Sequence, residues 1–517
     1  MIRELDFIFS PEQLFNKNHV LMSIANQIGV GVSDISSYRI VRKSIDARKG
    51  VKYNVRLQVA MNGDVFPDLR GNFEFRDVSK SREVIIIGAG PAGYFAALQC
   101  IMSGLKPVVF ERGKSVDDRK YDIAALNSRG VINPESNYAF GEGGAGTYSD
   151  GKLFTRSKKR GNVIEVLQLL HYFGADEDVL VDTHPHIGTD RLHSIIRNIR
   201  CKIIDSGGEI HFSSKLTGIN IIGNKVVSLV INGIDEYSCE NLILATGHSA
   251  RDIYYLLNSK GVILREKGFA MGVRVEHPQM LIDSIQYKCK ERGRFLPPAS
   301  YSLVKQIDGR GVYSFCMCPG GKIVSAITDD KSMVVNGMSN SKRNSPYANS
   351  GIVVELRPED YAFCSDNKIF SGLEFQKNLE TLAFRNGGGI AVAPAQRLTD
   401  FVSGKISADL PSVSYNPSVV SSPMHFWMPE FLSTRLREGF RLFDRQMHGF
   451  LTCEAVVVGV ESRTSSPLQV VRDGNTMRSV SVANIYPCGE GAGYAGGIVS
   501  SAIDGMEAVK RINDSLC

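Results

Sequence analysis

A chain of 517 residues with 43% hydrophobic and 22% charged residues has the composition of a globular protein and is long enough for two or three domains. Its formal net charge of +6 is small for this length, and its 60 Lys and Arg are scattered among 54 Asp and Glu, so nucleic acid is not an expected partner. No window offers the roughly 18 apolar residues of a membrane span, so none is expected.

Short sequence features argue against several special classes of protein. Met1–Ser10 places acids beside its apolar residues and is not expected to be a signal peptide. Ten cysteines are dispersed without a small-domain disulfide framework, which predicts reduced thiols in a cytoplasmic protein. His184 and His186 have no third ligand at a recognisable spacing, so no metal is expected. The basic run Arg156–Arg160 is expected to be a solvated loop.

Residues 1–80 are expected to form a small α+β module. Arg3–Phe9 has the pattern of a strand, and Ser10–Gln13 supplies an N-cap, a proline at the first helical position and a glutamine at the third, as in a capping box. Val51–Val59 alternates apolar and polar side chains like a strand with one buried face, and Ser37–Asp46 is its expected hairpin partner. The role of the module, as an interface or lid or as a structural appendage, stays open.

The next segment has the pattern of a dinucleotide-binding unit. Val84–Ile87 is a continuous β-branched run, typical of a strand buried in a parallel sheet. The glycine-rich stretch Gly88–Gly93 follows at once, and Pro91–Ser103 then carries apolar residues at helical spacing. A second apolar strand, Pro107–Phe110, ends in Glu111.

Each part of this unit has a physical role. Gly88 permits the tight turn, Gly90 lets the backbone approach a pyrophosphate, and Gly93 lets the helix pack close to the strand. The phosphate charge then lies at the positive end of the helix dipole. Glu111 follows Gly88 by 23 residues, where a carboxylate accepts hydrogen bonds from the adenosine ribose. The sequence therefore predicts that a dinucleotide binds here.

Two later segments are expected beside the same nucleotide. Gly141–Gly151 is so rich in glycine that it is expected to be a loop whose N–H groups bind pyrophosphate or flavin, the alternative being a flexible surface loop. Asn241–Gly247 is an expected buried strand that ends in Ala-Thr-Gly, where small residues leave room for a cofactor. Between them, the expected elements are a helix over Asp190–Ser206, a strand over Glu209–Ser213 and two strands within Ile219–Ile231.

Residues 263–453 are expected to form a second domain inserted into the nucleotide fold. Strand-like stretches such as Gly268–Val275 and Gly351–Leu356 alternate there with long loops, as in a mixed or antiparallel sheet. Substrate specificity is expected in this domain, because ligand sites commonly form between domains. The nucleotide-binding domain then consists of residues 81–262 and 454–517.

The end of the chain repeats the strand–glycine–helix pattern. Asn484–Cys488 is an expected strand, Gly489–Gly497 is glycine-rich, and a helix is expected over Ile498–Ile512. This unit would aim a second helix N-terminus at the cofactor, and its positive dipole end would stabilise an anionic reduced flavin.

Segments spread over most of the chain carry a resemblance to known proteins. They are GAGPAG at 88–93 with FERG at 110–113, GEGGAGTYSDGKL at 141–153, LATGHSARD at 244–252, GVRVEHPQ at 272–279, YSFCMCPGG at 313–321, PAQRLTDF at 394–401, ESRTSSP at 461–467 and PCGEGAGYAGGIVSSAIDG at 487–505. On these motifs the chain resembles the flavin-dependent oxidoreductases of the glutathione-reductase-like FAD-binding type. More narrowly, it is similar to the uncharacterised bacterial FAD-dependent dehydrogenases.

The resemblance implies an α/β fold: a Rossmann-like, three-layer FAD-binding domain with a parallel sheet, an inserted mixed or antiparallel β-rich domain and the small N-terminal module. It places Thr246 and Gly247 near the adenine side, and Gly489 and Glu490 near the ribityl chain, where Glu490 replaces the usual aspartate. Because only one full fingerprint is present, no dedicated NAD(P)H domain is expected, and NADH or NADPH as a diffusible reductant stays open. The expected cofactor-binding residues are Gly88, Gly90, Ala92, Gly93, Glu111, Arg112, Gly144, Gly146, Thr147, Asp150, Thr246, Gly247, Gly489, Glu490, Gly497 and Ile498.

Three residues are candidates for catalysis. On a strand, Cys316 and Cys318 would share one face, and a redox-active dithiol, pocket lining and core packing stay open as alternatives for them. Arg463, with the hydroxyl residues that follow it, suits an anionic substrate or the flavin edge, and a buried structural network is the alternative.

The sequence therefore predicts an FAD-dependent oxidoreductase. It would transfer a hydride between bound FAD and a small organic substrate in the cleft between the FAD and inserted domains. The alternative is a flavoprotein that uses FAD in RNA modification or as a structural or sensing cofactor. The substrate, the direction of electron flow and the oligomeric state are left open.

Overall fold

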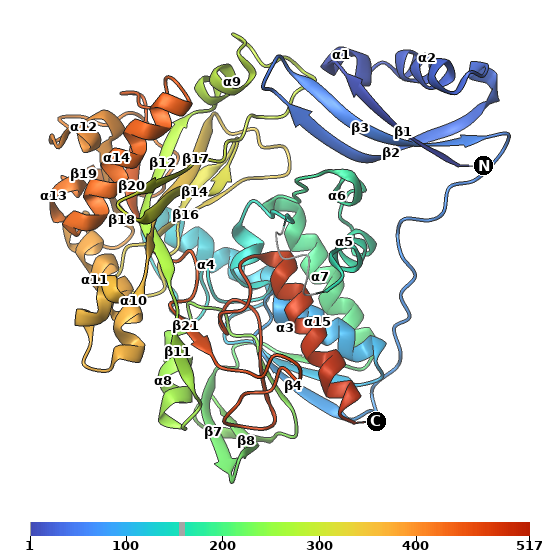
Figure 1. The fold of residues 1–517 in the computed structure, drawn as a ribbon. Coiled ribbons are helices and arrows are strands. Elements are labelled where there is room, and N and C mark those ends of the chain that lie inside the picture. The colour runs from blue at the N-terminus through green and yellow to red at the C-terminus, as the bar shows by residue number, and fades with distance from the viewer. Residues whose placement is uncertain (1, 155–160, 517) are drawn as a thin grey trace.

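A computed structural model describes residues 2–154 and 161–516 of the chain. Its fold is mixed α/β, with one parallel sheet and a separate β-rich sheet, as expected (Figure 1). The basic run Arg156–Arg160 lies outside the described residues. None of the described helices is long and apolar enough to cross a membrane.

The N-terminal module is an antiparallel sheet of order β1-β3-β2 with helices packed on one face (Figure 1). The capping box predicted at Ser10 is present, since its hydroxyl accepts from the Gln13 amide at 3.3 Å and the Gln13 side chain accepts from the Ser10 amide at 2.8 Å. The elements are β1 (Arg3–Phe9), α1 (Pro11–Leu14), α2 (Lys17–Ile28), the short 3-10 helix η1 (Val32–Asp34), β2 (Ile35–Asp46) and β3 (Lys52–Met61).

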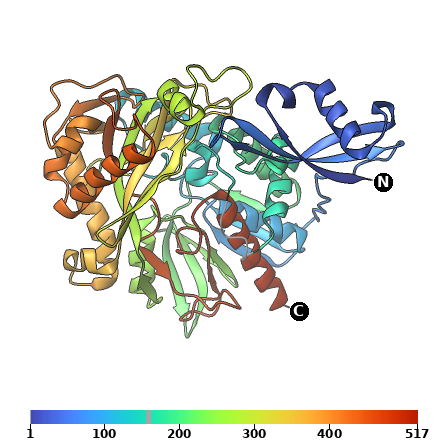
Figure 2. The same ribbon diagram turned by 45° about the horizontal axis from the view of Figure 1, so that its top comes forward.

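The module projects from one side of the molecule (Figure 2). Its contacts with the rest of the chain include the Tyr53 hydroxyl, which donates to the Phe295 carbonyl at 2.8 Å. The Lys43 ammonium lies 3.1 Å from the Asp182 carboxylate at the end of α6 (Asp178–Val181). None of the described residues of the module lines the cavity considered below.

The parallel sheet has the strand order β22-β10-β4-β5-β6. Helices α3 (Pro91–Met102) and α15 (Ile498–Asp514) pack against each other beside it (Figure 1). Their contact is close because Gly505 has no side chain: a Cβ there would lie 2.0 Å from the Ala92 carbonyl oxygen. The strands are β22 (Ile485–Pro487), β10 (Leu242–Leu244), β4 (Glu83–Ile87), β5 (Lys106–Phe110) and β6 (Glu209–His211).

The other elements of this half surround the sheet. An antiparallel sheet of three strands, β7 (Leu216–Ile222), β8 (Lys225–Ile231) and β9 (Asp235–Ser238), includes the predicted hairpin. The predicted helix in this region is α7 (Thr189–Asp205). The others are α4 (Val116–Arg129), the 3-10 helix η2 (Gly144–Tyr148), α5 (Val163–Tyr172) and α8 (Arg251–Ser259).

The β-rich sheet has seven strands, in the order β13-β14-β17-β12-β20-β18-β19, and its pairs are antiparallel except for β18 with β19. Strand β20 follows the expected boundary at residue 453, yet it pairs with β12 and β18, so this sheet extends to Glu461. The strands are β12 (Phe269–Pro278), β13 (Val304–Ile307), β14 (Arg310–Cys318), β17 (Tyr347–Leu356), β18 (Val392–Arg397), β19 (Ser418–Ser421) and β20 (Val456–Glu461).

Smaller elements complete this half. Two strand pairs, β15 with β16 and β11 with β21, are antiparallel. They and the surrounding helices are β11 (Leu264–Glu266), β15 (Lys322–Ser325), β16 (Val335–Met338), β21 (Leu468–Val470), α9 (Gln279–Tyr287), α10 (Pro358–Tyr361), η3 (Ala362–Cys364), η4 (Lys368–Phe370), α11 (Ser371–Asn386), α12 (Leu398–Ser403), α13 (Met424–Trp427) and α14 (Glu430–Gln446).

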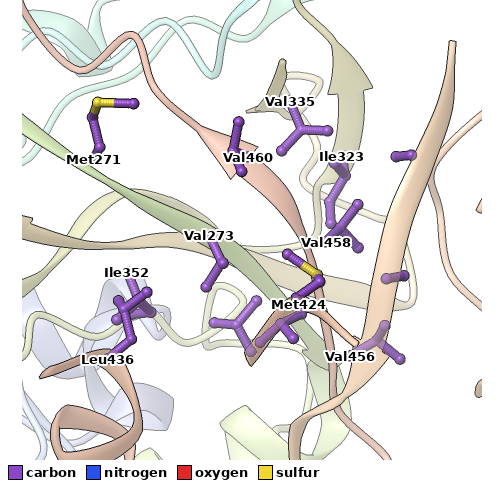
Figure 3. Packing of buried hydrophobic residues seen from close by; sticks show 14 of the residues in the cluster. Met271, Val273, Ile323, Val335, Ile352, Met424, Leu436, Val456, Val458 and Val460 are labelled. Atoms are coloured by element: carbon purple, nitrogen blue, oxygen red, sulfur yellow. The ribbon is translucent and has the colours of Figure 1, made fainter. Parts of the chain in front are cut away.

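The core of the β-rich half combines residues of the seven-stranded sheet, of its helices and of strands β15 and β16 (Figure 3). Val273 on β12 pairs with Ile352 on β17, and both side chains are fully buried. Leu436 on α14 and Met424 on α13 belong to the same cluster and are also fully buried. Because interiors are close-packed, this core makes the sheet a rigid support for the site described next.

Candidate functional site

A cavity of about 350 Å³ lies where the parallel strands end, between the parallel sheet and the β-rich half. The residues that follow β4, β5, β10 and β22 all line it, as expected for a ligand site at the carboxyl ends of parallel strands. Gly93 and Thr147 do not line it. The sequence-predicted residues that do are Gly88, Gly90, Ala92, Glu111, Arg112, Gly144, Gly146, Asp150, Thr246, Gly247, Cys316, Cys318, Arg463, Gly489, Glu490, Gly497 and Ile498.

The turn after β4 has the close contacts that its glycines predict. Gly88 has a φ of +103°, and a Cβ there would lie 2.4 Å from the Ala245 carbonyl oxygen. A Cβ on Gly93 would lie 1.8 Å from the Gly88 carbonyl oxygen. Gly93 therefore lets α3 pack on the turn, as its place in the fingerprint predicts, and its contact with a cofactor stays a prediction.

Gly90 differs from its neighbours because it faces open space. A Cβ on Gly90 would have only the Gly144 Cα within 4 Å, at 3.8 Å. Gly90 is also the N-cap of α3, and no side chain caps that end of the helix. Gly497 likewise begins α15 without a side-chain cap. Two helix N-termini thus border the cavity, and this donor set fits the diphosphate of FAD.

Glu111 holds the loops at this end of the sheet together. Its buried carboxylate accepts hydrogen bonds from the amides of Ala89 at 2.8 Å, Gly113 at 2.9 Å and Gly141 at 2.9 Å. The sequence pattern did not indicate this bracing role. Contact with an adenosine ribose stays a prediction.

The glycine-dense loop is a loop, as expected, with the short helix η2 inside it. Thr147 is fully buried, and its hydroxyl donates to the Glu142 carbonyl at 3.0 Å, while its contact with a cofactor stays a prediction. Asp150 is buried between Arg343, at 2.5 Å, and Lys152, at 3.3 Å. Burial acts to raise the pKa of Asp150, but the charges of Lys152 and Arg343 outweigh it and lower the pKa.

Cys316 and Cys318 both line the cavity, but not as alternate residues of a regular strand. The pairing of β14 with β17 shifts between Phe315 and Cys318, and Cys316 has a φ of +46°. The bulge therefore breaks the expected common face: Cys316 is exposed to the cavity and Cys318 is buried. The protein atoms that surround the cavity partly desolvate the Cys316 thiol and raise its pKa to about 11, although Lys152 acts to lower it.

A buried arginine supports this cysteine segment. The guanidinium of Arg274 is fully buried, lies 2.7 Å from the carboxylate of Glu461 and donates to the Cys316 carbonyl at 2.7 Å. It also donates to Asn349 at 2.8 Å and approaches the Cys318 sulfur at 3.7 Å. The pair of Arg274 and Glu461 was not predicted from the sequence. A charged residue within a mostly apolar strand, as on β12 and on β20, could have indicated a buried ion pair.

Arg463 belongs to a buried ion network and also lines the cavity, so its contact with an anionic substrate or the flavin edge stays a prediction. Its guanidinium lies 3.1 Å from the carboxylate of Glu380, which also binds Arg251 at 2.7 Å. It donates further to the hydroxyls of Ser249, at 3.3 Å, and Thr328, at 3.0 Å. Burial acts to raise the pKa of Glu380, but Arg251 and Arg463 lower it to about 2.

Paired charges also border the cavity beyond β5. Arg112 lies 2.6 Å from the carboxylate of Glu135 and 3.0 Å from that of Asp252, and its guanidinium lies 4.1 Å from the centre of the Phe140 ring. Lys215 also pairs with Glu135, at 2.7 Å. These charges balance one another without a ligand.

Lys152 is a cavity residue that the sequence reasoning missed. Its ammonium lies 3.3 Å from Asp150 and 3.7 Å from the Cys318 sulfur. Burial acts to lower the pKa of Lys152, but Cys318 and Asp150 raise it, so the side chain stays charged. Its position directly after the glycine-dense loop could have indicated that this cation lies at the ligand site. Among the described residues, no group of three or more His, Cys, Asp or Glu could hold a metal ion.

Two families match parts of the chain. A family described as "FAD-dependent protein, C-terminal domain-like" matches residues 268–464, which carry Cys316, Cys318 and Arg463. A domain of unknown function (DUF8436) matches residues 1–60, within the N-terminal module. An uncharacterized protein of Clostridium beijerinckii is 39% identical over 509 residues, covering 95% of this chain and 94% of that protein. The chain belongs to the same family as this Clostridium protein.

Several solved structures are similar over most of the chain. The tetracycline destructase Tet(51) is 10% identical with a TM-score of 0.33, covering 84% of this chain and 82% of that one. A geranylgeranyl bacteriochlorophyll reductase-like protein of Thermoplasma acidophilum is 11% identical with a TM-score of 0.35, covering 84% and 79%. The flavin-dependent brominase Bmp2 is 13% identical with a TM-score of 0.36, covering 84% and 80%. These TM-scores lie below the level at which a likeness indicates a shared fold.

Proposed function

We propose that this member of the family is an FAD-dependent oxidoreductase that transfers a hydride between FAD, bound in the cavity, and a small organic substrate held against the β-rich half. The single observation that carries the proposal is Gly90, which opens onto the cavity at the uncapped N-terminus of α3. The description of the family that matches residues 268–464 supports the same cofactor. The narrower assignment to the glutathione-reductase-like type stays a prediction.

The residues have separate parts in this proposal. The backbone of Gly88 and Gly90 and the first turn of α3 would hold the diphosphate, and the first turn of α15 would stabilise negative charge on the cofactor. FAD, when bound, supplies the group that accepts or gives up the hydride. Arg274 fixes the segment of Cys316 and Cys318 that borders the cavity on the substrate side.

An anaerobic titration of the purified holoprotein with NADH and NADPH tests the oxidoreductase activity. Bleaching of the flavin band at about 450 nm by one nucleotide would identify it as the reductant. No bleaching by either, with reduction by dithionite intact, would indicate that the protein takes electrons from its own substrate. A bound flavin that dithionite cannot reduce would contradict the proposal and favour a structural role for FAD.

The double variant Cys316→Ser with Cys318→Ser is expected to keep its FAD while its turnover or substrate affinity changes. Both thiols line the cavity, but neither lies in the glycine turn that would hold the diphosphate. Flavin content and the anaerobic reduction rate by substrate are the two measurements. Unchanged turnover of an identified substrate would show that both cysteines serve only packing.

A further inference from the structure

We propose that Lys152 and Asn336 form an anion-binding site in the cavity, and that the substrate is a small organic acid whose carboxylate they hold. The proposal rests on the proposed function, because the acid is taken as the reaction partner of FAD. Four features of the described residues support it: a carboxylate shared by two cations, two donors that face the cavity, and an apolar surface beside them.

The shared carboxylate is that of Asp150. This carboxylate is buried and shared by two cations, Arg343 at 2.5 Å and Lys152 at 3.3 Å. The charge of Arg343 also acts on Asp182, which pairs with Lys43 at 3.1 Å. The nearby pair of Arg274 and Glu461 is balanced by itself and adds no negative charge. Lys152 therefore has no carboxylate to itself, and an ammonium in an enclosed site is stabilised by a ligand of opposite sign.

The Lys152 ammonium is the first donor that faces the cavity. It carries three protons, and its partners among the described residues are Asp150, at 3.3 Å, and the Cys318 sulfur, at 3.7 Å. The sulfur contact is long, and the side chain remains 37% exposed where it lines the cavity. At least one N–H is therefore left for a ligand.

The Asn336 amide is the second donor. Its oxygen accepts from the Gly337 amide at 2.7 Å and from Arg274 at 3.3 Å, which fixes the orientation of the group. Its NH₂ is then the part left to face the cavity that Asn336 lines. Arg274 also approaches Cys318, which the Lys152 ammonium contacts, so a short chain of contacts links the two donors, and both line the same cavity. An ammonium and an amide NH₂ together suit the two oxygens of a carboxylate.

The surface beside these donors is apolar. Val324 on β15 pairs directly with Asn336 on β16, and both line the cavity. Ala326 and Phe315 line it as well. A ligand held by its carboxylate would therefore place a short apolar body against this surface, which favours an organic acid over an inorganic anion.

Butyrate and its neutral analogue butyramide test the proposal on the wild-type holoprotein. Calorimetry is expected to show saturable butyrate binding that is at least about tenfold tighter than butyramide binding. Lys152→Met should weaken butyrate binding by about tenfold or more without loss of FAD, and Lys152→Arg should keep most of it. Lys322→Met, which removes an exposed lysine from β15, is the matched control and should leave the affinity unchanged.

Equal affinities of the wild type for butyrate and butyramide would overturn the proposal, whatever the variants do. So would a Lys152→Met protein that binds butyrate as the wild type does. If that variant instead lowered the flavin midpoint potential with butyrate affinity unchanged, the Lys152 charge would serve the reduced flavin and not the substrate. A wild-type protein without FAD would contradict the proposed function, while the two ligands would still test the anion site by calorimetry.

Discussion

Replacing Gly90 with valine is expected to give a folded protein that no longer retains FAD. Gly90 has a φ of −76°, which any residue adopts, and an added Cβ would meet only the Gly144 Cα, at 3.8 Å. The protein itself therefore accommodates the change. The isopropyl group would occupy the part of the cavity where the diphosphate is proposed to meet the backbone. The ratio of flavin to protein absorbance should fall by at least about tenfold.

Gly474→Val is the matched control for this variant. Gly474 lies in a turn outside the cavity, and an added Cβ would meet no atom within 4 Å. The control should keep the wild-type flavin content, and both variants should show wild-type circular dichroism. A folded Gly90→Val protein with normal FAD content would show that the glycine turn does not hold the cofactor.

The second large effect is expected from Glu461→Gln. This change leaves the fully buried guanidinium of Arg274 without its charged partner at 2.7 Å. Breaking one side of a buried ion pair costs about 3–5 kcal/mol of unfolding free energy. Trp427, the single tryptophan of the chain, lies in the same half of the molecule and reports its unfolding in urea by fluorescence. The urea concentration at the midpoint of unfolding should fall accordingly.

Two controls separate the buried charge from a general effect of the substitution. Glu438→Gln removes one partner of an exposed pair with Arg441, at 3.2 Å, and should change the unfolding free energy by less than about 1 kcal/mol. The double variant Arg274→Met with Glu461→Leu removes both charges and should recover most of the loss. A Glu461→Gln protein as stable as the Glu438→Gln control would contradict the role given to this pair.

The elements whose pattern is local could be predicted from the sequence. The strand, turn and helix from Glu83 to Met102 have a required spacing, and the capping box at Ser10 is complete within four residues. The hairpin of β7 and β8 has alternation and a glycine turn. In each case the residues that decide the structure are close neighbours in the chain.

The parts that depend on distant contacts could not be predicted. Strand β20 follows the domain boundary that the change in sequence character suggested at residue 453. It nevertheless belongs to the β-rich sheet, because it pairs with β12 and β18, and such pairing cannot be read from composition. The Thr147 hydroxyl forms a hydrogen bond within its own loop. The bulge at Cys316 is held by a hydrogen bond from Arg274, which lies on another strand. Lys152 gains its significance from Asp150 and from Cys318, which lies 166 residues away in the chain.

Identification of the bound chromophore tests FAD binding most directly. The wild-type protein would be purified, denatured by heat, and the released compound identified by chromatography and mass spectrometry. The expected result is FAD at about one molecule per chain, since a single glycine fingerprint borders this cavity. A protein that carries no FAD when purified, and takes up none when incubated with an excess of it, would contradict the proposed function.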